Sequence, residues 1–290
     1  MNIALIGTSP IMLLLASKLS NKNNVTIFEN SKNYGGAWAY TKLGDQFIPA
    51  QTNMIIPKDR EEQRKVNKIN NYMFNNYGVN VFKVKNFSLI QPYKPKTIFI
   101  YELLKLYKVI EKLNVTIIKK KINSFYIKKN KVFLNKNKFD KIYLPYFSSI
   151  KNVRVNNKKF FLNHNSFKSK HLILLLKNQS VKNMKKYYIE KYDKVFDRML
   201  FTRKKKLSYI IARIKKDYKN KIFMKLAYDT KLKIIKKKKN NIIYKKYAYY
   251  VNNSRDTLQI NKLNELNKYK QIEVVNTTQF VKSFLKLKLL

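Results

Sequence analysis

The sequence predicts an α/β protein in which a parallel sheet with helices is joined to a second region of antiparallel strands. Three observations predict this class. Two short apolar runs enclose an apolar helical stretch within the first 29 residues. A third run, at 115–118, leads into short, turn-separated β segments. From about Lys151 onward, apolar runs alternate with turns in the manner of an antiparallel sheet.

The composition excludes several classes of protein. A chain of 290 residues with 45% hydrophobic and 14% aromatic residues can bury a real core and is not disordered. Because it has no cysteine, it holds neither a disulfide framework nor a thiolate metal site. Its two histidines, His164 and His171, leave little room for a histidine metal site or a catalytic triad. We therefore expect no metal, and the sequence identifies no catalytic residue.

The net charge of +47 comes from 56 lysines and only 7 arginines, accompanied by 35 asparagines. Lysine, asparagine, isoleucine, phenylalanine and tyrosine all have AT-rich codons, so an AT-rich genome accounts for this basic composition. A nucleic-acid-binding protein is expected to use arginine for bidentate contacts. We therefore predict no specific nucleic-acid partner, only weak and salt-sensitive binding of polyanions.

No stretch reaches the roughly 18–20 apolar residues that a membrane-spanning helix needs. The apolar run Ile11–Ala16 lacks the preceding basic residues of a signal peptide. We expect a soluble, cytoplasmic protein without a transmembrane segment, with peripheral contact to an anionic membrane left open.

The first forty residues contain the most informative pattern. Asn2–Ile6 is a continuous apolar run, which predicts a buried parallel strand. It ends at Gly7-Thr8-Ser9-Pro10, where Ser9 suits an N-cap and Pro10 the first helical position. Ile11–Leu19 then predicts an apolar helix. Val25–Phe28 predicts a second buried strand, and Glu29 follows it directly.

Strand, turn, helix, strand and acid in this order are the layout of a nucleotide-binding βαβ unit. The tight turn lets the helix N-terminus, with its free N–H groups and positive dipole end, face a pyrophosphate. An acid at the tip of the second strand can accept hydrogen bonds from a ribose. Gly35-Gly36 follows Glu29, and a glycine pair lets the backbone approach a ligand closely.

The N-terminal sequence resembles that of FAD-dependent oxidoreductases in three places: the turn 7–10, the strand ending in Glu29, and Gly35-Gly36-Ala37-Trp38. The similar group comprises amine oxidases, protoporphyrinogen oxidases and UDP-galactopyranose mutases. The resemblance implies a Rossmann-like FAD/NAD(P)-binding domain with a β-meander, plus an antiparallel-sheet substrate domain. It also implies these cofactor-binding residues: Gly7, Thr8, Ser9, Pro10, Glu29, Asn30, Gly35, Gly36, Ala37, Trp38 and Ile122. Among them, the turn and the glycine pair would meet the phosphates, Glu29 the adenosine ribose, and the backbone near Ile122 the adenine. For Trp38, an ordinary core position is an equal alternative.

This sequence departs from the family pattern at identifiable places. The family turn is G-x-G-x-x-G, and here Ser9 and Met12 replace the second and third glycines. The family also ends with a glycine-containing segment that touches the flavin, whereas no glycine follows Gly78. Three functions remain open. One is an FAD-dependent oxidoreductase (NAD(P) being the alternative cofactor) acting on an undetermined small molecule. The second is a non-catalytic descendant that acts as a nucleotide-binding or protein-interaction module. The third is a polyanion-binding protein, which only the net charge favours.

The remaining elements suggest a division of the chain. A polar helix is predicted at 60–77, a second helix at 98–113, and a third parallel strand at 115–118. A meander follows, and a strand at 140–144 closes it. Near the end, a strand at 273–275 precedes a helix at 277–290. We expect a discontinuous FAD-binding domain (1–60 and 98–150), a substrate or cap domain (61–97 and 151–270), and a C-terminal return (271–290) to the first domain.

Overall fold

A computed structural model gives the fold of the chain. The residues that it describes are 1–43, 45–50, 53–89, 95–146, 148–162, 166–177, 187–190, 196–203, 207–214, 242–253, 257–277 and 279–289. His164 of the sequence analysis lies outside them.

A five-stranded parallel sheet organises the N-terminal part of the chain. Its strands are β1 (Asn2–Ile6), β2 (Asn24–Phe28), β9 (Val115–Ile118), β13 (Lys141–Pro145) and β21 (Ile272–Val275). They pair in the order β21-β13-β1-β2-β9, and every pair is parallel. The chain thus builds the sheet outward from β1 in one direction and then returns to the other side of β1.

Both faces of the parallel sheet are buried, which explains why its strands are mostly apolar. Ile3, Leu5 and Ile27 face a cluster formed with the helices α1 (Pro10–Ser20), α3 (Leu104–Ile110) and α7 (Phe280–Lys286). Ala4, Ile6 and Phe28 face the opposite cluster. Successive residues of a strand point to opposite faces, so a run without polar residues suits a sheet covered on both sides.

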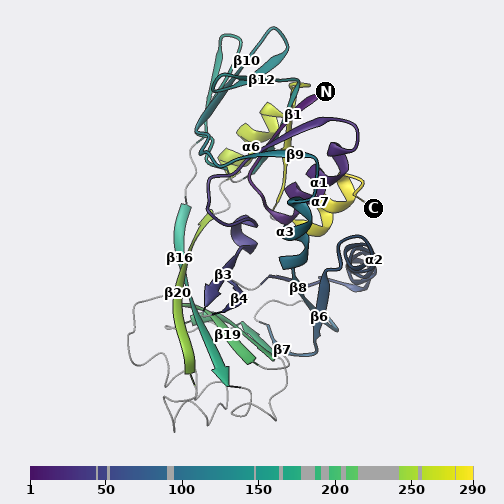
Figure 1. Cartoon of the computed structure of the whole chain (residues 1–290), viewed down its shortest axis with the longest axis vertical. Helices are drawn as coiled ribbons and strands as arrows, with labels where there is room; N and C mark the ends of the chain where they lie inside the picture. The colour runs from purple at the N-terminus through teal and green to yellow at the C-terminus, as the bar shows by residue number, and fades with distance from the viewer. Residues whose placement is uncertain are drawn as a thin grey trace.

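The second cover is a sheet instead of a layer of helices. Its strands are β10 (Ser124–Lys128), β11 (Lys131–Leu134), β12 (Asn137–Phe139), β14 (Asn152–Val155) and β15 (Lys158–Phe161), in the order β12-β11-β10-β14-β15. We call it the meander sheet. The helix α6 (Thr257–Leu266) adds Leu263 and Leu266 to the same apolar cluster. In Figure 1 the meander sheet stands at one end of the long axis of the molecule.

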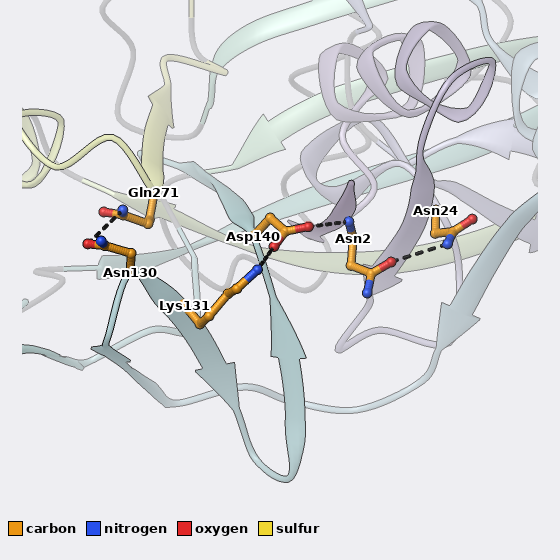
Figure 2. Close-up of polar contacts among 6 residues, drawn as sticks. All are labelled: Asn2, Asn24, Asn130, Lys131, Asp140 and Gln271. Atoms are coloured by element: carbon orange, nitrogen blue, oxygen red, sulfur yellow. Dashed lines mark hydrogen bonds and ion pairs between the residues drawn. The ribbon is translucent and has the colours of Figure 1, made fainter.

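Polar contacts fasten the meander sheet to the amino ends of the parallel strands (Figure 2). The Asp140 carboxylate accepts a hydrogen bond of 2.8 Å from the backbone N–H of Asn2 and pairs with the ammonium of Lys131. Asn24 donates to the side-chain oxygen of Asn2 at 3.2 Å. Gln271, just before β21, donates to Asn130 at the tip of the β10–β11 hairpin at 3.5 Å. These contacts set the position of the hairpin against β1 and β21.

Antiparallel sheets form the rest of the described chain. One contains β5 (Met54–Ile55), β8 (Ile98–Glu102) and β6 (Asn80–Val84), and a hairpin joins β3 (Tyr40–Leu43) to β4 (Gln46–Pro49). A six-stranded sheet has the order β20-β16-β19-β18-β17-β7 and extends away from the meander sheet in Figure 1. Its strands are β20 (Ile242–Asn253), β16 (Ser166–Lys177), β19 (Leu207–Ile214), β18 (Phe196–Arg203), β17 (Tyr187–Glu190) and β7 (Asn86–Ser88). All pairs in it are antiparallel except β7 with β17.

The predicted α/β class, with one parallel sheet and further antiparallel sheets, is therefore confirmed. The polar helix α2 (Arg60–Tyr77) has its predicted bounds, and its stripe Val66, Ile69 and Met73 is buried. The helix predicted at 98–113 is wrong in its first part, because 98–102 is the strand β8, paired with β5 and β6. The apolar run 98–102 can form either a helix or a strand. It forms a strand because β5 and β6 pair with it on both sides. The C-terminal helix is also shorter than predicted, since α7 covers Phe280–Lys286.

In the part of the chain that the structure describes, no helix combines the length and the hydropathy needed to cross a membrane.

Candidate functional site

The turn after β1 lies where the strand order of the parallel sheet reverses, between β1 and β13. In open α/β sheets, ligands bind outside the carboxyl ends of the strands at such a point. Gly7 has a φ of +81°, and its N–H donates to the carbonyl of Phe28 at the end of β2 at 2.8 Å. In the described part of the chain, no atom beyond the neighbours of Gly7 lies within 4 Å of where its Cβ would be. The turn is therefore held to β2 while one side of Gly7 stays open.

Ser9 and Pro10 begin α1 as predicted, but the side chain of Ser9 does not cap it. Pro10 is the first helical residue, and the first helical bond joins the N–H of Leu13 to the carbonyl of Ser9 at 3.0 Å. The Oγ of Ser9 is buried and has no hydrogen-bond partner among the residues that the structure describes. No acidic residue lies in the first turn of α1. The N-terminus of α1 therefore keeps its positive dipole end uncompensated and has a spare hydroxyl beside it.

Glu29 is buried, with 5% of its surface exposed, and its carboxylate is already held by the chain. One oxygen accepts from the backbone N–H of Ser31 at 2.6 Å and from its hydroxyl at 2.8 Å. The other oxygen accepts from the hydroxyl of Thr8, which is itself 1% exposed. The Thr8 hydroxyl oxygen in turn accepts from the N–H of Gly35 at 3.0 Å. This network joins the turn after β1, the acid after β2 and the glycine pair.

The two glycines of the pair have different neighbours. Gly35 has a φ of +108°, and a Cβ there would lie 2.5 Å from the Oη of Tyr107 on α3 and 2.9 Å from the Cα of Ala39. Gly36 has a φ of +54°, and its Cβ would lie 3.9 Å from the Cα of Ser9. Gly35 is thus required by packing within the protein, whereas Gly36 faces the start of α1.

Trp38 ends the short 3₁₀ turn η1 (Gly36–Trp38) and packs among aromatic side chains. Its ring stacks on Phe280 with centroids 5.4 Å apart and planes at 14°, and it lies 5.9 Å from the ring of Tyr101. Its carbonyl accepts from the Oη of Tyr107 at 3.0 Å and from Asn53 at 3.1 Å. These contacts place the indole against the helical core cluster.

Desolvation changes the acidity of the aromatic residues and of one lysine near this site. Burial raises the pKa of Tyr101 and of Tyr40 well above the usual tyrosine value. Both phenols therefore stay neutral throughout the physiological range. Partial burial lowers the pKa of Lys119, and the negative charge of Glu29 offsets part of that effect. The ammonium of Lys119 lies 3.9 Å from the ring centroid of Tyr34.

The structure brings most of the predicted residues to one edge of the parallel sheet. The contacts described above bring together seven of them: Gly7, Thr8, Ser9, Pro10, Glu29, Gly35 and Gly36. Asn30 and Ala37 are exposed beside them. Ile122 is buried in the cluster beneath the meander sheet, and its carbonyl accepts from the hydroxyl of Ser149 at 2.5 Å.

Two residues of this site were not found from the sequence. Ser31 supplies two donors to Glu29, and its position two residues later is a spacing at which a serine reaches a neighbouring side chain. Tyr107 fills the space that Gly35 leaves, and no local sequence signal connects residues so far apart.

The groups at this edge fit the pyrophosphate of a dinucleotide. Three features form a donor set for phosphate oxygens: the α1 N-terminus without an acid in its first turn, the buried Ser9 hydroxyl that no described residue pairs with, and the side-chain-free backbone of Gly36. Glu29 has fewer free acceptor positions for a ribose than an unpaired carboxylate would have. A carboxylate oxygen accepts about two hydrogen bonds, so only the oxygen that faces Thr8 has an acceptor position left.

Comparison with known proteins gives a fold but no sequence family. No family model matches the chain, and no curated protein matches it in sequence. Among solved structures, an Exiguobacterium sp. 255-15 protein assigned as a protoporphyrinogen oxidase has a TM-score of 0.62 at 7% identity, covering 99% of this chain and 98% of its own. Putrescine oxidase with bound putrescine has a TM-score of 0.60 at 8% identity, covering 99% and 96%. An oxidoreductase from Methanosarcina mazei has a TM-score of 0.54 at 10% identity, covering 96% and 94%. The chain shares the fold of these oxidoreductases, the group that its sequence resembles.

Proposed function

We propose that the chain is an FAD-dependent oxidoreductase with a small-molecule substrate and a Rossmann-like FAD-binding unit. The observation that carries this proposal is the convergence, at the point where the strand order reverses, of the α1 N-terminus, the spare Ser9 hydroxyl and Gly36. A dinucleotide pyrophosphate is the chemical group that such a donor set stabilises best. The fold that the chain shares with putrescine oxidase supports a flavin cofactor, with NAD(P) as the alternative.

In this proposal the chain's own residues bind and orient the cofactor. The N–H groups at the start of α1 and the hydroxyl of Ser9 donate to the phosphates, and Gly36 lets its backbone lie against them. Glu29 accepts from the ribose at the carboxylate oxygen that now accepts from Thr8. Bound flavin would supply the redox chemistry, because its ring system accepts a hydride without a triad from the protein. The same proposal includes a substrate or cap domain formed by 61–97 and 151–270. It also includes the return of 271–290 to the FAD-binding domain, and a cytoplasmic location.

One observation favours the second candidate, a non-catalytic descendant of the fold. Trp38, which ends the turn that contains Gly36, stacks on Phe280, the first residue of α7. In the family that the sequence resembles, the segments around both positions pass near the flavin. With Trp38 and Phe280 stacked, a nucleotide binds at the α1 end without a place for the flavin ring.

An absorption spectrum distinguishes the two candidates. The purified chain is mixed with FAD, desalted and scanned from about 300 to 550 nm, where protein-bound flavin absorbs. The oxidoreductase predicts retained flavin bands, and Glu29→Gln should lose most of them. A chain that melts cooperatively but keeps no flavin would contradict the proposal. A shift of its melting temperature with NAD(P) would then support the nucleotide-binding descendant.

A further inference from the structure

The outer face of the meander sheet carries a row of basic and aromatic side chains. Pairing runs from Lys138 on β12 to Phe133, then Tyr126, then Arg154, and ends at Lys159 on β15. Residues paired directly across strands point to the same face of a sheet. One row of five strands therefore presents a cation, two aromatic rings and two further cations in sequence.

Burial shows which face this is. The alternate residues of the same strands, including Phe125, Val132 and Val153, are buried against the parallel sheet and α6. Tyr126 is 42% exposed, and Phe161, two residues along β15 from Lys159, is 59% exposed. The row is thus on the solvent side, and its aromatic rings are not needed to fill the core.

The two rings are stacked on each other, which leaves one face of each ring for a base. Tyr126 and Phe133 are parallel within 6°, with centroids 4.8 Å apart. Beside them, a groove of about 750 Å³ is lined by Tyr126, Arg154, Lys159 and Phe161 among others. The Nε of Arg154 donates to the carbonyl of Asn156 at 3.2 Å, which orients the guanidinium at the groove.

The charge of this face has one sign. None of the five strands contains an aspartate or glutamate, and Asp140 is the one acid between residues 119 and 162, against thirteen lysines and arginines. Asp140 pairs with Lys131, at the edge facing β1. Among the described residues, neither Arg154 nor Lys159 takes part in an ion pair. A solvated surface alone does not require stacked rings between cations.

We propose that this face binds single-stranded nucleic acid, with bases stacked on Tyr126 and Phe133 and phosphates held by Arg154 and Lys159. Sheets that display aromatic rings among basic side chains bind single strands in this way, because every base has a face to stack and every nucleotide a phosphate. The planar, positively charged guanidinium of Arg154 can both stack on a base and donate hydrogen bonds to a phosphate. Tyr126, Phe133, Arg154 and Lys159 are not among the proposed cofactor-binding residues, so the inference does not depend on the proposed function.

The test is a fluorescence-anisotropy titration of the full chain with a labelled oligothymidylate of about 12 nucleotides, within the range that one such site covers. The charge variant is Arg154→Gln/Lys159→Gln, and its matched control removes two exposed lysines from α2 and α3, Lys68→Gln/Lys108→Gln. We expect the charge variant to lose about tenfold in affinity. The slope of log K against log salt should also fall by about 1.4, as for two lost phosphate contacts on a single strand. The control should change affinity by less than about twofold.

A second pair of variants tests the rings. Tyr126→Leu/Phe133→Leu should lose at least about fivefold in affinity at constant salt, with the salt slope unchanged. Phe74→Leu, which changes an exposed aromatic residue on α2, should have no effect. The melting curve confirms folding of each variant.

Three results would overturn the inference. Equal losses in the two charge pairs would show general attraction by a basic protein. Unchanged affinity in the ring variant would remove the stacking surface. Binding of the wild type to phosphatidylserine-containing vesicles, with none to oligothymidylate, would assign the face to a membrane surface instead.

Discussion

The two edges of the parallel sheet differ in what their polar groups leave unused. At the amino edge, Asp140 meets both Asn2 and Lys131, and Asn24 joins Asn2. Those contacts join chain segments, which is a structural role. At the carboxyl edge, the Thr8–Glu29 network also joins chain segments, yet the buried hydroxyl of Ser9, beside a helix N-terminus, has no partner in the described chain. Because buried polar groups are normally paired, this remaining donor is what points to a ligand.

The largest effect on folding is expected at Gly35. Gly35→Ala would place a Cβ 2.5 Å from the Tyr107 hydroxyl, at a φ of +108° that L-residues rarely adopt. We expect a loss of about 3 kcal/mol in the free energy of unfolding, measured by chemical denaturation. Gly36→Ala is the matched control, with its Cβ at an ordinary 3.9 Å from Ser9, and it should cost about 1 kcal/mol. Equal losses would show that the two glycines are not distinguished by packing.

Glu29→Gln is expected to have the next largest effect. The amide cannot accept at both ends, so either the buried hydroxyl of Thr8 or the two donors of Ser31 lose their acceptor. The free energy of unfolding should fall by about 2 kcal/mol. A variant as stable as the wild type would mean that the network does not hold the turn to the glycine pair.

At the opposite edge, Asp140→Asn should cost about 1 kcal/mol, because its ion pair with Lys131 is partly exposed. Lys131, and then the N–H of Asn2, lower the pKa of Asp140 below its usual value. A carboxylate with a lowered pKa in the folded state stabilises the protein above its unfolded pKa and loses this effect as the pH falls further. The difference between wild type and variant should therefore be constant near neutral pH and shrink below about pH 4. A difference that grows with acidity would contradict this assignment.

Ser9→Ala is expected to have the smallest effect on folding. It removes a buried hydroxyl that has no partner, so the ligand-free protein should gain up to about 1 kcal/mol. The same change should weaken FAD binding. A variant that is destabilised would show that Ser9 has a structural partner in solution.

The sequence predicted best what depends on neighbouring residues. The run Asn2–Ile6, Pro10 at the first helical position and the helix 60–77 were placed correctly, because apolar periodicity and local turn chemistry determine them. Residues 98–102 were placed in a helix, since a short apolar run does not distinguish a strand from a helix before its partners are known. The pairing of β14 with β10 likewise depends on contacts between distant segments.

In the candidate site too, features set by neighbouring residues were predicted better than those set by distant contacts. Spacing along the chain brought out Gly7, Glu29 and the glycine pair, which do meet at one edge. Their chemistry was less predictable. The side chain of Ser9 does not make the expected capping hydrogen bond. Gly35 is needed because Tyr107, on a helix distant in sequence, packs against it. Hydrogen-bond partners in three dimensions cannot be obtained from the order of residues alone.

The central claim is that the carboxyl edge binds the dinucleotide part of FAD. The most direct measurement is a titration that follows flavin fluorescence with FAD and, separately, with FMN, which lacks the adenosine ribose and the pyrophosphate. We predict that FAD binds at least about a hundredfold more tightly than FMN, since each lost charged or hydrogen-bonded contact costs about 1.5–3 kcal/mol. Equal affinity for the two flavins, or no binding of FAD by a chain that melts cooperatively, would contradict the claim.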